Sequence, residues 1–414
     1  MKHGTSISRR DFLVAGAAAA AVSPLRGVLA QNPPGNKAKI TLSRDHAHSL
    51  FKEVAAWIHQ LKIDAECMAV AGDRPVEGLS IFIRGECARL LGIAAGELQE
   101  PRYREAVLGS AKLLASRQLP EGVWNDGILQ GNIYLCDSTQ ACNALYSALP
   151  FASNSQKRAF LTALDAFANY LRYGSDTDPS GMGRGGSRGF LFPDGSVGLG
   201  YRHNDVGPDG VARPHLDATP FPVASGIVGA RFSSMYASLN QSPFFKAFSK
   251  QSIEWLSRTG TTPEGYVRYY LPPRQVKGTR WELALTAYCG EGWLWTLYQT
   301  VDGDEERKTL KDAARKWIDW IVSTQNDRGL WDRGDEGNMD RSPLAPLFLM
   351  GYHNLFGDRE DVVAAINKFL ANVADPARRD AFFFMRRKRS TVFTGLMLAE
   401  YLWPGRAFGR VASS

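Results

Sequence analysis

Apolar residues recur at every third or fourth position along most of the chain, which is the spacing of amphipathic α-helices. Leu50, Val54, Ile58 and Leu61 show this spacing in the first of twelve such segments. The spacing predicts helices near residues 46–62, 78–93, 102–117, 137–149, 157–173, 221–239, 280–300, 304–323, 359–373 and 390–403. Two further helices are expected to begin at Pro243 and Pro343, because serine followed by proline is a common helix start.

The connections between these helices alternate in length. Those after odd-numbered helices have about 15 to 46 residues and the others about two to seven. Because successive antiparallel helices place alternate loops at opposite ends, all six long loops should emerge on one face. The even-numbered helices are apolar on most sides, as inner helices are. The pattern predicts an all-α fold, an (α/α)6 toroid or barrel of helical hairpins over residues 44–405.

Residues 1–30 have the pattern of an export signal. The sequence SRRDFLV at 8–14 is a twin-arginine motif, an apolar run follows at 15–22, and small residues precede a cleavage position before Gln31. We therefore expect a twin-arginine signal at 1–30, a linker at 31–43 and a tail at 406–414, with the mature protein periplasmic or secreted. No later run of about 20 apolar residues follows, so no membrane contact is expected after signal removal.

Net charge, cysteine content and missing motifs limit the classes of partner and cofactor that we expect. A net charge of +7 favours an acidic partner, and without a nucleic-acid-binding motif we expect an anionic polymer, bound by a monomer. The five cysteines form no CxxC pair, which favours buried thiols; one disulfide in an oxidising compartment is the alternative. No metal-binding or nucleotide-binding motif is present, so neither a metal ion nor a cofactor is expected.

The longest connection, residues 174–220, shows neither helical nor strand periodicity. Its apolar residues, such as Phe190 and Leu199, argue against disorder, so we interpret it as a functional loop. It contains His203 and His215, with Asn204 beside the first. Histidine exchanges protons near neutral pH, and loops on rigid scaffolds commonly carry such residues. We therefore expect catalytic chemistry in this loop.

A repeated segment allows the architecture to be compared with known families. The sequences QLPEGVW at 118–124 and QNDRGLW at 325–331 each end an expected outer helix, and TTPEGY at 261–266 is similar. A helix leading into Q…G-W, followed by a loop and an alanine-rich helix, resembles the toroids of glycoside hydrolases, polysaccharide lyases and terpenoid cyclases. The DxDD motif of terpene cyclases is absent, and export argues against lipid cyclisation.

The long loops together should form the binding site. Aromatic faces suit sugar rings, and arginines suit carboxylates. The expected substrate-binding residues are Trp124, Asn125, Asn132, Tyr134, Tyr201, Arg202, Tyr270, Arg274, Trp281, Glu282, Trp331, Arg333, Arg341, Arg386 and Arg387, the last two belonging to the basic run 386–389.

One chemistry that fits these residues is β-elimination. Cleavage of a uronate polymer removes the proton beside the carboxyl group, so the carboxylate charge must be stabilised and a base supplied. His203-Asn204 followed by Arg268 and Tyr269 is similar to the Asn-His pair, arginine and tyrosine of toroid-fold alginate lyases, although the first pair is reversed and the later spacing is shorter. The resemblance implies proton transfer by His203 or His215 and Tyr269, with Asn204 and Arg268 on the carboxylate. The substrate would be of the alginate or glucuronan type.

Hydrolysis is the main alternative, because it needs two carboxylates flanking the glycosidic bond. The candidate acids are Asp126, Asp137, Glu282, Asp332, Asp335 and Glu336. The sequence GLWDRGDE at 329–336 loosely resembles the unsaturated-uronide hydrolases. A non-catalytic glycan-binding toroid is the third interpretation.

Overall fold

The structure is a computed structural model, and it describes residues 39–61, 69–71, 74–76, 81–124, 133–176, 188–206, 212–272, 282–331, 341–381 and 388–410. All of these residues belong to one compact unit, Asn36–Val411. The twin-arginine sequence and most of the linker lie outside the described residues, so the expectations about export remain predictions.

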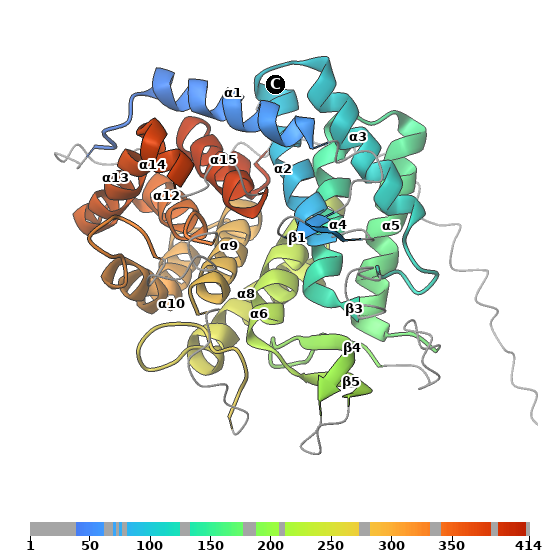
Figure 1. Cartoon of the computed structure of the whole chain (residues 1–414). Helices are drawn as coiled ribbons and strands as arrows, with labels where there is room; N and C mark the ends of the chain where they lie inside the picture. The colour runs from blue at the N-terminus through green and yellow to red at the C-terminus, as the bar shows by residue number, and fades with distance from the viewer. Residues whose placement is uncertain are drawn as a thin grey trace, which may run out of the picture. The chain divides into compact units, whose positions relative to one another are not determined.

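All twelve helices expected from the sequence are present (Figure 1). They are α1 (Arg44–Gln60), α2 (Ile81–Glu97), α3 (Pro101–Ser116), α4 (Leu135–Ala148), α5 (Asn154–Tyr173), the segment α6 (Pro222–Ala224), η3 (Ser225–Phe232) and α7 (Ser233–Asn240), α8 (Pro243–Trp255) with η4 (Leu256–Gly260), α9 (Glu282–Thr300), α10 (Asp304–Ser323), α12 (Leu344–Phe356), α13 (Glu360–Ala374) and α15 (Lys388–Leu402). Shorter helical turns are η2 (Leu149–Phe151), α14 (Pro376–Ala381) and η5 (Arg406–Phe408).

Six of the helices form an inner ring. Helix α2 contacts α4, α4 contacts η3, and η3 with α7 contacts α9; α9 then contacts α12, α12 contacts α15, and α15 returns to α2. The inner helices are buried on nearly all sides, whereas the outer helices α5, α10 and α13 bury one stripe. The fold is therefore the all-α (α/α)6 toroid that the sequence predicts.

The chain also forms strands, which the sequence analysis did not predict. A hairpin pairs β4 (Gly198–Val206) with β5 (Ala212–Pro220), and the short strand β3 (Ile133–Tyr134) joins its edge (Figure 1). Two further short strands are β1 (Ala69–Ala71) and β2 (Arg74–Val76). The expectation of an irregular loop over residues 174–220 was wrong for these strands, because pairing with β3 and with each other satisfies backbone groups without an apolar alternation.

A glycine turn recurs in four of the long connections that follow outer helices, in the described part of the chain. Gly122, Gly195, Gly265 and Gly329 have φ of +98, +91, +105 and +80°. A Cβ atom at these glycines would lie 2.5, 2.5, 2.6 and 2.7 Å from a backbone carbonyl oxygen of the next outer helix. Only glycine fits both the backbone angle and this close approach. The turn therefore fixes each hairpin to its neighbour.

Two residues after each glycine, a backbone N–H donates to a hydroxyl group at the following inner helix. The acceptors are Ser138, Ser225, Thr286 and Ser342, at 3.3, 3.1, 2.9 and 2.9 Å. In two of the turns a glutamine side chain bonds the turn to the next outer helix. Gln325 Nε2 donates to the carbonyl groups of Gly329 and Ala365, at 3.0 and 2.9 Å, and Gln118 Nε2 donates to those of Gly122 and Ala163, at 2.8 Å each. The Q…G-W repeat of the sequence is thus a structural turn.

The C-terminal ends of the inner helices are closed by residues 405–410. The Nε of Arg89 donates to the Ala407 carbonyl at 2.8 Å, and Gln299 donates to the Phe408 carbonyl at 2.9 Å. The carboxylate of Glu400 accepts from the backbone N–H of Gly405 at 2.8 Å. Although the sequence analysis ended the toroid at residue 405, residues 406–410 pack against three of its inner helices through these bonds and η5.

Candidate functional site

The six long connections precede the N-terminal ends of the inner helices, which we call the open end of the toroid. Tyr288, in the second turn of α9, lies on the toroid axis at this end. Its ring contacts Phe82 at the start of α2 and Phe393 of α15, with centroid distances of 5.7 and 5.9 Å. Because α9 and α2 are not neighbours in the inner ring, Tyr288 reaches across the axis and forms part of the floor of the open end.

Arginine side chains lie near this tyrosine. Arg389, in the first turn of α15, places its guanidinium carbon 5.2 Å from the centroid of the Phe82 ring. Arg341 precedes α12 and is half-buried. Burial raises the pKa of the Tyr288 hydroxyl well above its ordinary value, although Arg389 and Arg341 act in the opposite direction. Tyr288 is therefore a protonated hydrogen-bond donor at neutral pH.

Four charged residues fill the axis below Tyr288, and we call them the axial quartet: Glu86, Arg89, Arg231 and Glu291. Arg89 donates to Glu86 and to Glu291 at 2.9 Å each, and Arg231 donates to Glu86 at 3.0 Å. All four side chains are buried, and their charges sum to zero. The quartet therefore separates the open end from the segment 405–410.

The two carboxylates of the axial quartet differ in their protonation. Burial opposes the charged form of Glu86, but Arg231 and Arg89 outweigh it and hold its pKa below the usual value. Burial raises the pKa of Glu291, because Arg231 lies farther from this carboxylate, at 3.6 Å, and Glu86 repels its charge. Glu291 is consequently the group of the quartet that protonates first as the pH falls.

The β4–β5 hairpin carries the histidines expected from the sequence. Arg202 pairs with His215 and Asp205 pairs with Arg213, so that His203 and Asn204 together oppose Pro214. Proline has no N–H to donate, which interrupts the ladder and favours a bulge there. The structure does not describe the side chains of residues 201–218, so these side chains, including Tyr201, Arg202, His203, Asn204 and His215, keep their roles only as predictions.

The base of this hairpin meets the tyrosines expected at the site. Tyr269 and Tyr270 are half-buried, and each ring lies 5.5 Å from the ring of Phe221, the residue after β5. Arg268 precedes them and is half-buried, with its backbone N–H bonded to the Gly260 carbonyl at 2.8 Å. The structure thus places the Arg268–Tyr270 segment next to the end of β5, and the assignment of this segment and the hairpin to one site stays a prediction.

Other expected site residues have different positions. Tyr134 is half-buried in β3 and pairs with Gly200 of β4, and Glu282 is half-buried at the first position of α9. Asp137, an acid candidate, is half-buried in the first turn of α4. Asn125, Asn132, Arg274, Trp281, Arg333, Arg386 and Arg387 lie outside the described residues, as do Asp126, Asp332, Asp335 and Glu336.

Two tryptophans expected to bind substrate are instead part of the core. Trp124 and Trp331 are 1% and 3% exposed. Their indole N–H groups donate to the carbonyl groups of Leu114 and Ile321, at 2.7 Å in both cases. The expectation that their rings would stack on sugars was wrong, because both follow the recurring turn and point back into the helical pair.

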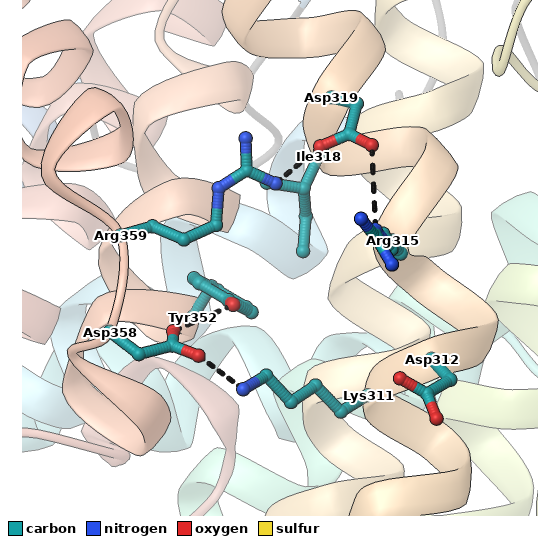
Figure 2. A pocket seen from close by; sticks show the side chains of 8 residues that line it. All are labelled: Lys311, Asp312, Arg315, Ile318, Asp319, Tyr352, Asp358 and Arg359. Atoms are coloured by element: carbon teal, nitrogen blue, oxygen red, sulfur yellow. Dashed lines mark hydrogen bonds and ion pairs between the residues drawn. The ribbon is translucent and has the colours of Figure 1, made fainter.

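A depression of about 350 Å³ lies elsewhere, on the outer helix α10 and the short connection between α12 and α13 (Figure 2). Its side chains are largely paired: Lys311 and Tyr352 donate to Asp358, and Arg359 bonds Asp319. This depression is a surface groove bridged by ion pairs, and it adjoins the C-terminal end of α12, opposite to the N-terminal ends that define the open end.

Residues 39–410, within the described ranges, carry few other features of a site. Cys136, Cys142 and Cys289 are free thiols there, and burial raises the pKa of each. The same residues contain no group of three or more histidine, cysteine or acidic side chains placed to hold a metal ion. None of their helices has the length and apolar character needed to span a membrane.

Sequence reasoning missed Tyr288 and used Arg389 only as one member of a basic run. A usable signal was present, since Tyr288, Glu291 and Trp295 lie at spacings of three and four residues in an otherwise apolar helix. Residues with this spacing share one helix face. A charged residue on an inner helix therefore marks the face toward the axis.

Comparisons with known proteins support the architecture. No protein-family model and no curated protein matches the sequence. A type II terpene cyclase from Scytonema, in complex with geranylgeranyl dihydroxybenzoate, is similar in structure with a TM-score of 0.52 at 10% identity, over 87% of this chain and 98% of that one. The chain shares the toroid fold.

Two sugar-active enzymes are also similar in structure. Cellobiose 2-epimerase from Spirochaeta thermophila has a TM-score of 0.49 at 13% identity, over 80% of this chain and 86% of that one. Unsaturated glucuronyl hydrolase from Bacillus sp. GL1 has a TM-score of 0.41 at 13% identity, over 72% of this chain and 87% of that one.

Proposed function

We propose that this protein is an exported polysaccharide lyase that cleaves an anionic, uronate-containing polysaccharide of the alginate or glucuronan type by β-elimination. The observation that carries the proposal is the bulge at His203-Asn204 in a hairpin whose base packs on Tyr269 and Tyr270. Bulges re-aim side chains and are common beside active sites. A proton-transfer residue and a carboxylate-binding amide would then be presented by one strand at the open end.

The proposed reaction assigns a role to each of these groups. Asn204 and Arg268 would stabilise the negative charge that develops on the carboxylate when the neighbouring carbon loses its proton. His203 or His215 would take that proton, and Tyr269 would return a proton to the departing sugar oxygen. The electron pair of the broken C–H bond forms the carbon–carbon double bond and expels the leaving oxygen. From Gln31 onward the chain has 45 Lys and Arg against 41 Asp and Glu, and this net charge of +4 supports an anionic substrate.

The mature protein, beginning at Gln31, should be incubated with alginate, glucuronan and pectate while ultraviolet absorbance is recorded. Elimination creates a conjugated double bond that absorbs there, whereas hydrolysis creates reducing ends without that absorbance. We expect absorbing products from at least one uronate polymer. His203→Ala should lower the rate at least a hundredfold, since general acid–base catalysis contributes about that much or more. His46→Ala, at an exposed position of α1, is the matched control and should leave the rate unchanged.

Hydrolysis is the second candidate, because Asp137 and Glu282 are half-buried in the first turns of two inner helices at the open end. Two carboxylates near a scissile bond are the requirement of that reaction. Reducing ends without ultraviolet absorbance would replace the lyase proposal by this one. In that case Asp137→Asn and Glu282→Gln, rather than His203→Ala, should abolish the activity.

A further inference from the structure

The hydroxyl group of Tyr288 takes no part in the hydrogen bonds that the described residues make with one another. The residue is 8% exposed, and within the described part of the chain its hydroxyl makes no hydrogen bond. The hydroxyl oxygen is not one of the buried polar atoms that lack a partner, so it keeps access to solvent at the open end and can donate to a ligand there. The ring is held on two sides by Phe82 and Phe393, so the position of the hydroxyl on the toroid axis is fixed by packing.

Arg389 is a second group of this kind. Its guanidinium lies over the Phe82 ring at 5.2 Å, and among the described residues no carboxylate forms an ion pair with it. Its Nε–H is buried and donates to no acceptor there. Within the part of the chain that the structure describes, the other charged groups near Tyr288 are Arg341 and the two carboxylates of the axial quartet, which bond Arg89 and Arg231. Arg389 therefore places beside Tyr288 a positive charge that no carboxylate of the described residues neutralises.

We propose that Arg389 and Tyr288 together bind the carboxylate group of a uronate residue, with the guanidinium as the ionic partner and the phenol hydroxyl as a second hydrogen-bond donor. The Phe82 ring holds the guanidinium by a cation–π contact, which leaves its N–H groups available to a carboxylate. This inference rests on the proposed uronate substrate, but it concerns binding and does not depend on the reaction type.

The protonation of Tyr288 agrees with this role. Burial raises the pKa of its hydroxyl, so the group keeps its proton at neutral pH and can donate to an anion. Below it, the axial quartet is neutral as a whole and its four side chains are buried. An anion at the Tyr288 hydroxyl therefore meets the guanidinium of Arg389, and the quartet beneath adds no net opposing charge.

Calorimetric titration of the mature protein with glucuronan oligosaccharides tests the proposal. The matched ligand is the same oligosaccharide with its carboxyl groups reduced to alcohols. Wild-type protein should bind the uronate form more tightly than the reduced form. Arg389→Gln should weaken uronate binding about ten- to a hundredfold and Tyr288→Phe about three- to tenfold, in line with hydrogen bonds to a charged group. Both variants should bind the reduced ligand as the wild type does.

Two substitutions control for nonspecific effects. Arg315→Gln removes a cation from the exposed surface of α10, and Tyr173→Phe removes a hydroxyl from a residue that is 64% exposed; both should bind as the wild type. Arg389→Lys keeps the charge but not the fork of donors, so its affinity should lie between those of the wild type and Arg389→Gln. Far-ultraviolet circular dichroism verifies that each variant is folded.

The outcomes separate this inference from the proposed function. Uronate affinity that is unchanged in Arg389→Gln and Tyr288→Phe, or absent from the wild type, overturns the inference even where unsaturated products form. If the wild type prefers the uronate ligand over the reduced ligand and Arg389→Gln loses this preference, the inference is supported. This holds even where the wild type forms no unsaturated product. The absence of that product would refute only the lyase reaction. A loss that is equal for both ligands would assign Arg389 to general packing and overturn its role with the carboxylate.

Discussion

Removing one arginine from the axial quartet should have a large effect on stability. In Arg231→Met, the buried carboxylates of Glu86 and Glu291 retain only Arg89 as a cation, so one negative charge is left uncompensated at the toroid axis. Breaking a buried pair in this way typically costs about 3–5 kcal/mol. We expect the free energy of unfolding to fall by about that amount at neutral pH.

A second substitution should restore about half of this loss. Glu86→Gln combined with Arg231→Met leaves Arg89 and Glu291 paired at 2.9 Å, and the group is neutral again. The double variant should therefore be more stable than Arg231→Met alone by about 2 kcal/mol, although it lacks two charged groups. Urea denaturation of the mature protein and the three variants, followed by far-ultraviolet circular dichroism, gives the four values of the cycle.

The pH dependence of the cycle is a second readout. In Arg231→Met the folded-state pKa of a buried carboxylate should rise above its unfolded value, so the folded state binds the extra proton more tightly. The stability deficit should then shrink as the pH falls below neutral, and this trend should be weaker in the double variant. Costs of the two substitutions that add within about 0.5 kcal/mol at neutral pH would refute an ionic network at the axis.

Two further predictions concern the turn and the closed end. Gly329→Ala should destabilise the protein by more than 1 kcal/mol, because φ is +80° and the new Cβ would lie 2.7 Å from a carbonyl oxygen. The control Gly303→Ala meets no atom within 4 Å and should change the free energy of unfolding by less. Equal urea midpoints for the two variants would contradict this prediction. Burial raises the pKa of Glu400 to about 7, so its contribution to stability is fully present below its unfolded pKa and is lost as the pH rises through 7. Wild-type stability should therefore fall by about 3 kcal/mol more between pH 4.5 and 8 than that of Glu400→Gln, and parallel pH profiles of the two proteins would contradict the assignment.

Periodicity was sufficient to predict the helices because each one buries a stripe or its whole surface. The Ser-Pro pair at 242–243 correctly indicated the start of α8, and the alternation of loop lengths correctly indicated the inner and outer rings. The Q…G-W repeat was recognised, but Trp124 and Trp331 were given a binding role, since a sequence does not show on which side of a turn an indole lies.

The β4–β5 hairpin and the floor of the open end could not be predicted from hydrophobic periodicity. Strands β4 and β5 contain glycine, proline and polar residues on both faces, so they lack the apolar alternation that identifies half-buried strands. Tyr288 belongs to an apolar inner helix, and its position opposite Phe82 depends on closure of the inner ring. Contacts made across an axis by helices distant in sequence have no local signature.

The four glycine turns also determine where this architecture can change. Each turn packs against the next outer helix and bonds the following inner helix, so the long connection is anchored at that point. Insertions and exchanges beyond that anchor need not disturb the packing of the helices. The toroid can therefore acquire new substrate preferences by replacing segments at one end, while the helices that support them keep their register.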